Sequence, residues 1–161
     1  MNKIINLNIA CGDNFITENE WVNLDYESNN LNVIKCDVLK KIPFTENSVS
    51  SIYTSHFIEH IPLNKIDKFL QDCFRVLKYG GIIRIVTPDF VEMTRSYINA
   101  IDNNNPIEFE YIKIEILDQL IRNKEGGNLR STFKKIIKED NQEMKNLIKK
   151  RLGYNLEDNR L

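Results

Sequence analysis

The chain of 161 residues lacks the features on which several protein classes depend. Its three cysteines show no CxxC spacing, which argues against a disulfide framework or a zinc site. No apolar stretch approaches the roughly 20 residues that span a bilayer. The N-terminus has one lysine before a short apolar run broken by two asparagines, which makes a poor signal peptide. We therefore expect a cytoplasmic protein that does not enter membranes.

An excess of charge of one sign is also missing. The chain has 22 basic and 23 acidic residues and a net charge of −1, which gives no sign of a nucleic-acid-binding surface. Basic residues gather late in the chain, but acids and apolar residues alternate with them, which predicts a solvated helix face. The hydrophobic content of 42% and the charged content of 28% are ordinary for a soluble globular protein.

Three short apolar runs near the start each stop at small or acidic residues. They predict strands at residues 4–10, 21–25 and 33–37. The first run ends in the small-residue bend Ala10-Cys11-Gly12, the second ends at Asp25 and the third at Asp37. Because ligands bind outside the carboxyl ends of strands in open parallel sheets, these residues mark a candidate binding edge.

The following segment alternates between strand and helix patterns. Residues 49–55 and 82–87 read as strands, and 63–78 reads as a helix whose apolar positions follow i, i+3, i+4, i+7 and i+11. We expect Gly80-Gly81 to end that helix, since glycine adopts a left-handed cap at little cost. The alternation predicts an α/β fold with a mostly parallel sheet and helices on both faces.

The character of the chain changes after Pro88. Amphipathic patterns predict helices at 90–102, 107–123, 129–139 and 141–152. We therefore divide the chain into an α/β core over residues 1–102 and a helical extension over residues 103–161. The extension is interpreted as part of the same domain, or as an element for dimerisation or for covering an acceptor.

Five motifs occur in order over about residues 5–90. They are LNIACG at 7–12, WVNLD at 21–25, DV and IPF within 37–44, IYTSHFIEH at 52–60, and RVLKYGGIIRIVTPD at 75–89. In this order and spacing the chain resembles class I S-adenosylmethionine-dependent methyltransferases of the methyltransferase-11-like branch. The resemblance implies a Rossmann-like sheet of about five strands, S-adenosyl-L-methionine as cofactor and S-adenosyl-L-homocysteine as product.

The residues at the strand ends suit such a cofactor. Small residues in the first bend let the backbone approach a ligand closely, although any tight strand-exit loop needs them too. Asp25 can accept hydrogen bonds from ribose hydroxyls, and Asp37 can accept from an adenine amino group; each could instead be a surface or capping acid. The predicted cofactor-binding set is Asn8, Ala10, Cys11, Gly12, Asp25, Tyr26, Asp37, Val38, Ser55 and His56.

Both histidines of the chain lie just beyond the fourth predicted strand, with an acid between them. His56 and His60 are the candidate catalytic residues, since histidine can accept a proton near neutral pH. In the alternative interpretation Glu59 or His60 orders the loop before Pro62, and His56 packs beside the cofactor. We expect no metal, because there is no HExxH pattern and no marked third ligand.

The chain departs from the family pattern in two respects. Ala10 stands where the family has glycine, and alanine is costly there if its φ is positive. Nothing after residue 102 reads as the two further strands with which family members close their sheet. Strand 82–87 would then lie at an unprotected edge. We therefore predict a homodimer through that edge or the C-terminal helices, or an edge that those helices cover.

The motifs predict methyl transfer from S-adenosylmethionine to an oxygen or nitrogen of a small molecule or a sugar or glycan precursor. The alternative is a truncated, non-catalytic methyltransferase-like module that binds cofactor or a partner chain. A nicotinamide-dependent enzyme is disfavoured because no GxGxxG motif opens a helix. No nucleic acid and no membrane are expected among the partners.

Overall fold

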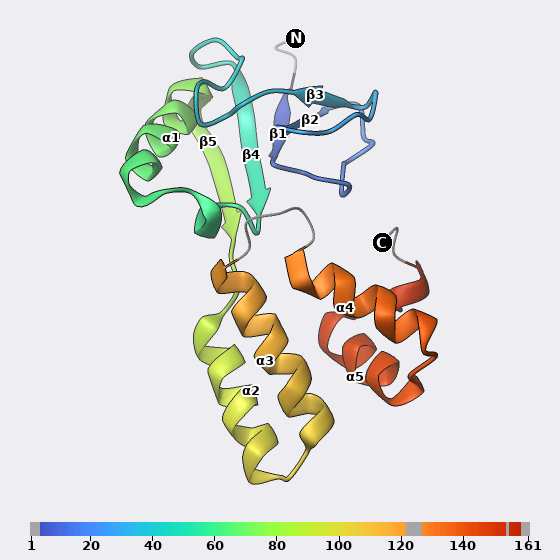
Figure 1. Cartoon of the computed structure of the whole chain (residues 1–161). Helices are drawn as coiled ribbons and strands as arrows, with labels where there is room; N and C mark the ends of the chain where they lie inside the picture. Colours follow the sequence, from blue (N-terminus) through green and yellow to red (C-terminus); the bar gives the residue numbers. More distant parts are fainter. Residues whose placement is uncertain (1–3, 122–126, 154, 159–161) are drawn as a thin grey trace. The chain divides into compact units, whose positions relative to one another are not determined.

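The computed structural model describes residues 4–121, 127–153 and 155–158. The chain forms two compact units, Met1–Thr87 and Pro88–Leu161 (Figure 1). Helix α2 (Phe90–Asp102), which we assigned to the α/β core, therefore falls in the second unit. Among the described residues, no helix is both long and apolar enough to cross a membrane.

The first unit is a five-stranded parallel sheet with the strand order β3-β2-β1-β4-β5. Its elements are β1 (Asn6–Ile9), β2 (Trp21–Asp25), β3 (Val33–Lys35), β4 (Val49–Ser55), η1 (Ile58–His60), α1 (Leu63–Val76) and β5 (Leu77–Val86). The prediction of a Rossmann-like α/β fold with about five parallel strands is confirmed. The C-terminal helical extension is also present, as the second unit.

One face of the sheet is apolar and holds the core of the first unit. The register places Leu7 beside Val22 and Ile52, so these side chains point to the same face. The core cluster joins strand residues of this face to the buried stripe of α1, with Phe69 1% and Val76 0% exposed. Burying a side chain of this size contributes about 1.5–3 kcal/mol, so α1 is fixed on the sheet mainly by this face.

The opposite face carries an asparagine pair instead of an apolar surface. Asn8 and Asn23 are each 3% exposed, and the Asn8 amide donates to Asn23 Oδ1 at 3.0 Å and to the Asn14 carbonyl at 3.1 Å. Asn23 in turn exchanges two bonds of 2.8 Å with the backbone of Ile16. The segment that covers this part of the sheet is thus an irregular loop, held by hydrogen bonds.

We expected helices on both faces of the sheet. Within the first unit, the connections β1–β2, β2–β3 and β3–β4 contain no helix over their described residues, and α1 packs on the apolar face. The asparagine pair gives the physical reason, because a polar sheet face offers nothing for the apolar stripe of a helix to cover.

The predicted end of the first helix was wrong by two residues. Helix α1 ends at Val76 and β5 begins at Leu77, which pairs with Val49. The pairing then jumps to Ser51 with Ile82, so β5 advances five residues while β4 advances two. Gly80, with φ 75°, turns the chain inside this bulge and does not cap the helix.

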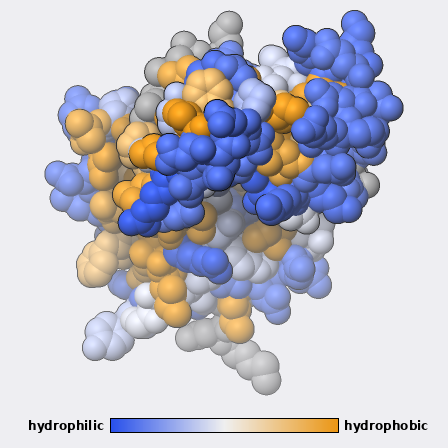
Figure 2. All heavy atoms as spheres, turned by 90° about the horizontal axis from the view of Figure 1, so that it is seen from below, coloured by the Kyte–Doolittle hydropathy of each residue, from blue (hydrophilic) through white to orange (hydrophobic). Residues whose placement is uncertain are grey.

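Strand β5 is an edge strand, as predicted. It pairs with β4 on one side, and no strand of the described chain pairs with its other side. Ile82 is 68% exposed there, and exposed apolar side chains occur in both units. Figure 2 shows hydrophobic residues at the surface of the face that it draws. The dimer that we expect at this edge stays a prediction.

The second unit is helical. Its elements are α2, α3 (Pro106–Ile121), α4 (Gly127–Lys138), α5 (Gln142–Leu152) and η2 (Leu156–Asp158). Helix α2 begins after Asp89, whose side chain accepts from Glu92 N–H at 2.9 Å, and α5 ends at Gly153 with φ 80°. The predicted helices are confirmed, except that residues 122 and 123 of one of them lie outside the described residues.

Helices α3 and α4 are joined by a buried carboxylate. Asp118 of α3 is 1% exposed and accepts hydrogen bonds from the Asn128 and Leu129 N–H groups in the first turn of α4. An acid is stabilised at this end of a helix by the free N–H groups and by the helix dipole. The core of the unit is built around Tyr111 and Ile112, both 0% exposed.

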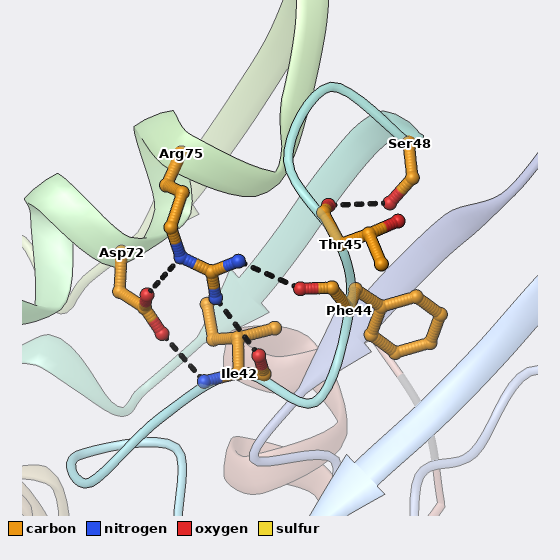
Figure 3. Close-up of polar contacts among 6 residues, drawn as sticks. All are labelled: Ile42, Phe44, Thr45, Ser48, Asp72 and Arg75. Carbon is orange, nitrogen blue, oxygen red and sulfur yellow. Dashed lines mark hydrogen bonds and ion pairs between the residues drawn. The ribbon is translucent and has the colours of Figure 1, made fainter.

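Arg75 ties helix α1 to the turn that precedes β4 (Figure 3). Its guanidinium donates to Phe44 O at 2.7 Å, to Ile42 O at 3.0 Å and to Asp72 Oδ1 at 2.6 Å. The second oxygen of Asp72 accepts from Ile42 N–H. Burial alone would raise the pKa of Asp72, but the bonds from Arg75 and from Ile42 N–H outweigh it and lower that pKa.

We predict that Arg75→Met destabilises the first unit by about 2–3 kcal/mol, because two carbonyls and a carboxylate lose a charged donor. Urea unfolding followed by the fluorescence of Trp21, the single tryptophan, measures the loss. Lys68→Ala, on the exposed part of α1, is the control and should change stability by less than about 0.5 kcal/mol. Equal midpoints for both variants would contradict the role of Arg75.

A second prediction concerns acid stability. Because the folded pKa of Asp72 is lowered, its contribution is present above the unfolded pKa of about 3.9 and is lost as pH falls through the folded value. The unfolding free energy of the natural chain should therefore fall more steeply below about pH 4 than that of Asp72→Asn. Parallel curves for the two proteins would show that the pair gives no acid-dependent stability.

Candidate functional site

The carboxyl ends of β1, β2, β3 and β4 meet at one edge of the sheet because the strands are parallel. Immediately after these ends lie the bend at Ala10, the acids Asp25 and Asp37, and His56. The structure thus brings together at one edge the residues that the sequence marked at separate strand ends.

The bend after β1 uses two left-handed residues. Ala10 has φ 55° and Gly12 has φ 52°. The bend is fixed by Cys11 N–H donating to Leu24 O at 3.3 Å and by Asn14 N–H donating to Cys11 O at 2.9 Å. A Cβ added at Gly12 would meet no atom within 4 Å, so open space lies beside this backbone. Ala10, by contrast, carries a Cβ in a conformation that disfavours one.

The carboxylate of Asp25 joins the ends of β1 and β2. Its Oδ2 accepts from Gly12 N–H at 2.8 Å, and its Oδ1 accepts from Glu27 N–H at 3.0 Å. A carboxylate has about four acceptor positions, so two remain for a ligand. The side chain is therefore held in one orientation and can still accept further hydrogen bonds.

Asp37 occupies the corresponding position after β3. Its Oδ1 accepts from Leu39 N–H at 3.1 Å, and Oδ2 lies 3.5 Å from Lys40 Nζ. The strand end is tied to β2, since Cys36 N–H donates to Asp25 O at 2.8 Å. The next residue, Val38, is 7% exposed and belongs to the core cluster.

Two further predicted contacts differ in their surroundings. Asn8 lies within β1 and not at its end, and its amide supports the bend through the Asn14 carbonyl. Tyr26, after β2, is 61% exposed, so its ring is accessible at the edge. Their contact with a cofactor stays a prediction.

His56 follows the last residue of β4 in a left-handed conformation with φ 52°. Its N–H donates to Val86 O at 2.9 Å, and the preceding Ser55 pairs with Val86 in the sheet. The imidazole is 46% exposed, and its Nδ1 lies 3.5 Å from Glu59 Oε1. Left-handed backbone at a non-glycine residue is strained, and such strain collects at functional sites.

Glu59 is the residue whose importance the sequence reasoning missed. It was grouped with the histidines but was not assigned to the site. Its side chain is 18% exposed, and its two oxygens are buried without a hydrogen-bond donor among the described residues. The available signal was its place three residues after His56, which a single helical turn brings close.

The cysteines are poor nucleophiles in this environment. Burial, and the nearby Asp25 carboxylate, raise the pKa of Cys11 to about 12, and burial raises the pKa of Cys36 as well. Both thiols are therefore neutral at physiological pH. Within the described part of the chain, no group of three or more His, Cys, Asp or Glu residues could hold a metal ion.

Comparison with known proteins identifies a family for the first unit. Residues 7–85 match the model of a family described as "Methyltransferase domain". The match begins in β1 and ends in β5, so it includes every strand and α1. A search of curated proteins found no match.

We predict that Ala10→Gly stabilises the first unit by about 0.5–1 kcal/mol. Relief of a left-handed alanine is worth about 1–2 kcal/mol, and the extra unfolded-state freedom of glycine removes about 0.5–1 of it. Urea unfolding observed at Trp21 provides the measurement. Ser50→Gly, at an ordinary position of β4, should instead destabilise; a loss of stability in both variants would refute strain at Ala10.

Proposed function

We propose, because the α/β unit of this chain belongs to the methyltransferase-domain family, that the chain binds S-adenosylmethionine and transfers its methyl group to an acceptor. The observation that carries the proposal is the carboxylate of Asp25, oriented by Gly12 N–H at the end of β2 and beside the small-residue bend. The remaining acceptor positions of this carboxylate match the paired hydroxyls of a ribose.

The residues at the sheet edge fit the parts of such a cofactor. Asp25 would accept from the ribose, and the open space at Gly12 would admit the amino-acid end close to the backbone. Asp37 would accept from the adenine amino group, with Tyr26 exposed nearby in sequence to contact a ring. Each of these assignments rests on the donor and acceptor chemistry of the side chain.

When bound, S-adenosylmethionine supplies an activated methyl group on a positively charged sulfur. The protein's part is then to align the acceptor, to exclude water and to receive a proton. His56 is our candidate for receiving that proton, because it lies at the same edge and its imidazole is half exposed. His60, within η1, is the second candidate.

We propose a small molecule or a sugar or glycan precursor as acceptor, methylated on oxygen or nitrogen. A non-catalytic module that binds the cofactor or a partner chain is the second candidate. It is favoured by one observation, which is that every predicted cofactor residue lies in the first unit, whereas the second unit is helical. Formation of S-adenosylhomocysteine by the isolated chain distinguishes the enzyme from the module.

Asp25→Ala should weaken the binding of S-adenosylhomocysteine by about 1–3 kcal/mol, because charge-assisted hydrogen bonds to the ribose are lost. Isothermal titration calorimetry gives the affinity. Glu18→Ala is the matched control, since this exposed acid precedes β2 and lies beyond the other end of that strand. Asp25→Asn, which keeps an acceptor oxygen for Gly12 N–H, separates the charge from the fold of the bend.

Binding of equal strength in Asp25→Ala and in the natural chain would refute the ribose contact. No heat with the natural chain would refute the proposed function itself. Unfolding at Trp21 should be measured for each variant, so that a loss of binding is compared at matched stability.

A further inference from the structure

Glu59 holds a buried charge that the folded core does not use. Both of its oxygens are inaccessible and, among the described residues, neither accepts a hydrogen bond. The ionisable group that faces it is the imidazole of His56, with Nδ1 3.5 Å from Oε1. A buried polar group without its hydrogen bonds calls for an explanation other than stability.

The loop-ordering role considered for Glu59 does not account for this environment. A carboxylate that orders a loop does so by accepting from backbone N–H groups, as Asp25 and Asp37 do here. The backbone of η1 is instead held by its own bonds, with His60 N–H donating to Phe57 O at 3.0 Å and Ile61 N–H to Ile58 O at 3.1 Å.

Both partners of the pair are fixed in place. Phe57 packs edge-to-face against Phe69 of α1 with ring centroids 5.6 Å apart, and Ile61 is 5% exposed in the core. These two anchors enclose Glu59 in the chain. On the other side, His56 is tied to β5 through its N–H bond to Val86 O. The 3.5 Å separation therefore joins two rigid attachments, and such catalytic pairs are often long before the ligands bind.

We propose that Glu59 is a positioning residue that keeps the proton of neutral His56 on Nδ1, so that Nε2 is free to accept a proton from the methyl acceptor. This inference rests on the proposed function, because it assigns a role within the same site. The exposed side of the imidazole is then the side that meets the acceptor, and the buried side meets the carboxylate.

The step that this arrangement serves is balanced as follows. The acceptor oxygen forms a bond to the methyl carbon while the bond from that carbon to sulfur breaks, and the pair of electrons leaves with sulfur. The hydroxyl proton passes to His56 Nε2, and the imidazolium that results lies beside the Glu59 carboxylate. An acceptor atom that carries a proton, such as a hydroxyl oxygen, is the kind that needs this pair.

The tautomer of His56 is the direct test, and the chain suits it because it contains only two histidines. Nitrogen-15 correlation spectra of the labelled full chain, at a pH where the rings are neutral, distinguish a protonated Nδ1 from a protonated Nε2. A His60→Gln variant assigns the two rings. We expect the His56 proton on Nδ1 in the natural chain, and a change of the major form to Nε2–H in Glu59→Leu.

Leucine is chosen because it removes the acceptor and keeps an apolar volume, so Glu59→Leu should be at least as stable as the natural chain. Glu59→Gln keeps the shape without the charge and should lower the Nδ1–H fraction, which provides a test if leucine prevents folding. Glu18→Leu, at an exposed acid, should leave the His56 signals unchanged.

Two outcomes would overturn the inference: an Nε2–H form in the natural chain, or the same major form after Glu59 is replaced. Calorimetry with S-adenosylhomocysteine is run on the same samples. Absent binding in the natural chain would refute the proposed function, whatever the tautomer. Binding that persists with an unchanged tautomer would refute the role of Glu59 alone.

Discussion

The hydrogen bond from Gly12 N–H to the Asp25 carboxylate joins the ends of the two inner strands at the candidate site. It holds a bend in which one non-glycine residue, Ala10, lies in a disfavoured region of backbone space. The same carboxylate accepts from Glu27 N–H, so one side chain defines the exits of both β1 and β2. The position of every other candidate group is set relative to this junction through the parallel register of the sheet.

The two faces of the sheet are stabilised by different physics. On one face, apolar residues of β1, β2 and β4 bury against α1. On the other, the pair of Asn8 and Asn23 secures a loop by directional bonds, each of which contributes about 0.5–1.5 kcal/mol. A loop held in this way can pass over the sheet and enter the bend at Ala10 without a helix, which leaves Gly12 beside open space.

Local signals in the sequence were sufficient for most elements. Strand and helix positions follow from apolar periodicity and from breaks such as Pro88, and caps such as Asp89 were read correctly. Features that depend on distant partners were not predictable. The start of β5 is set by the pairing of Leu77 with Val49, and the left-handed φ of Ala10 depends on bonds made by its neighbours. The isolation of the Glu59 carboxylate likewise depends on packing that residue types alone do not specify.

The central place of β1 has a consequence for the order in which the chain can fold. Its two neighbours are β2, close in sequence, and β4, whose Ser51 hydroxyl bonds to Asn6 across 45 residues. On the ribosome β1 therefore waits with one hydrogen-bonding side unsatisfied until β4 has emerged, since a non-local partner forms late and at a cost in loop closure. The nascent first unit is an incomplete sheet during that interval, and chaperones that recognise exposed strand edges have their opportunity there.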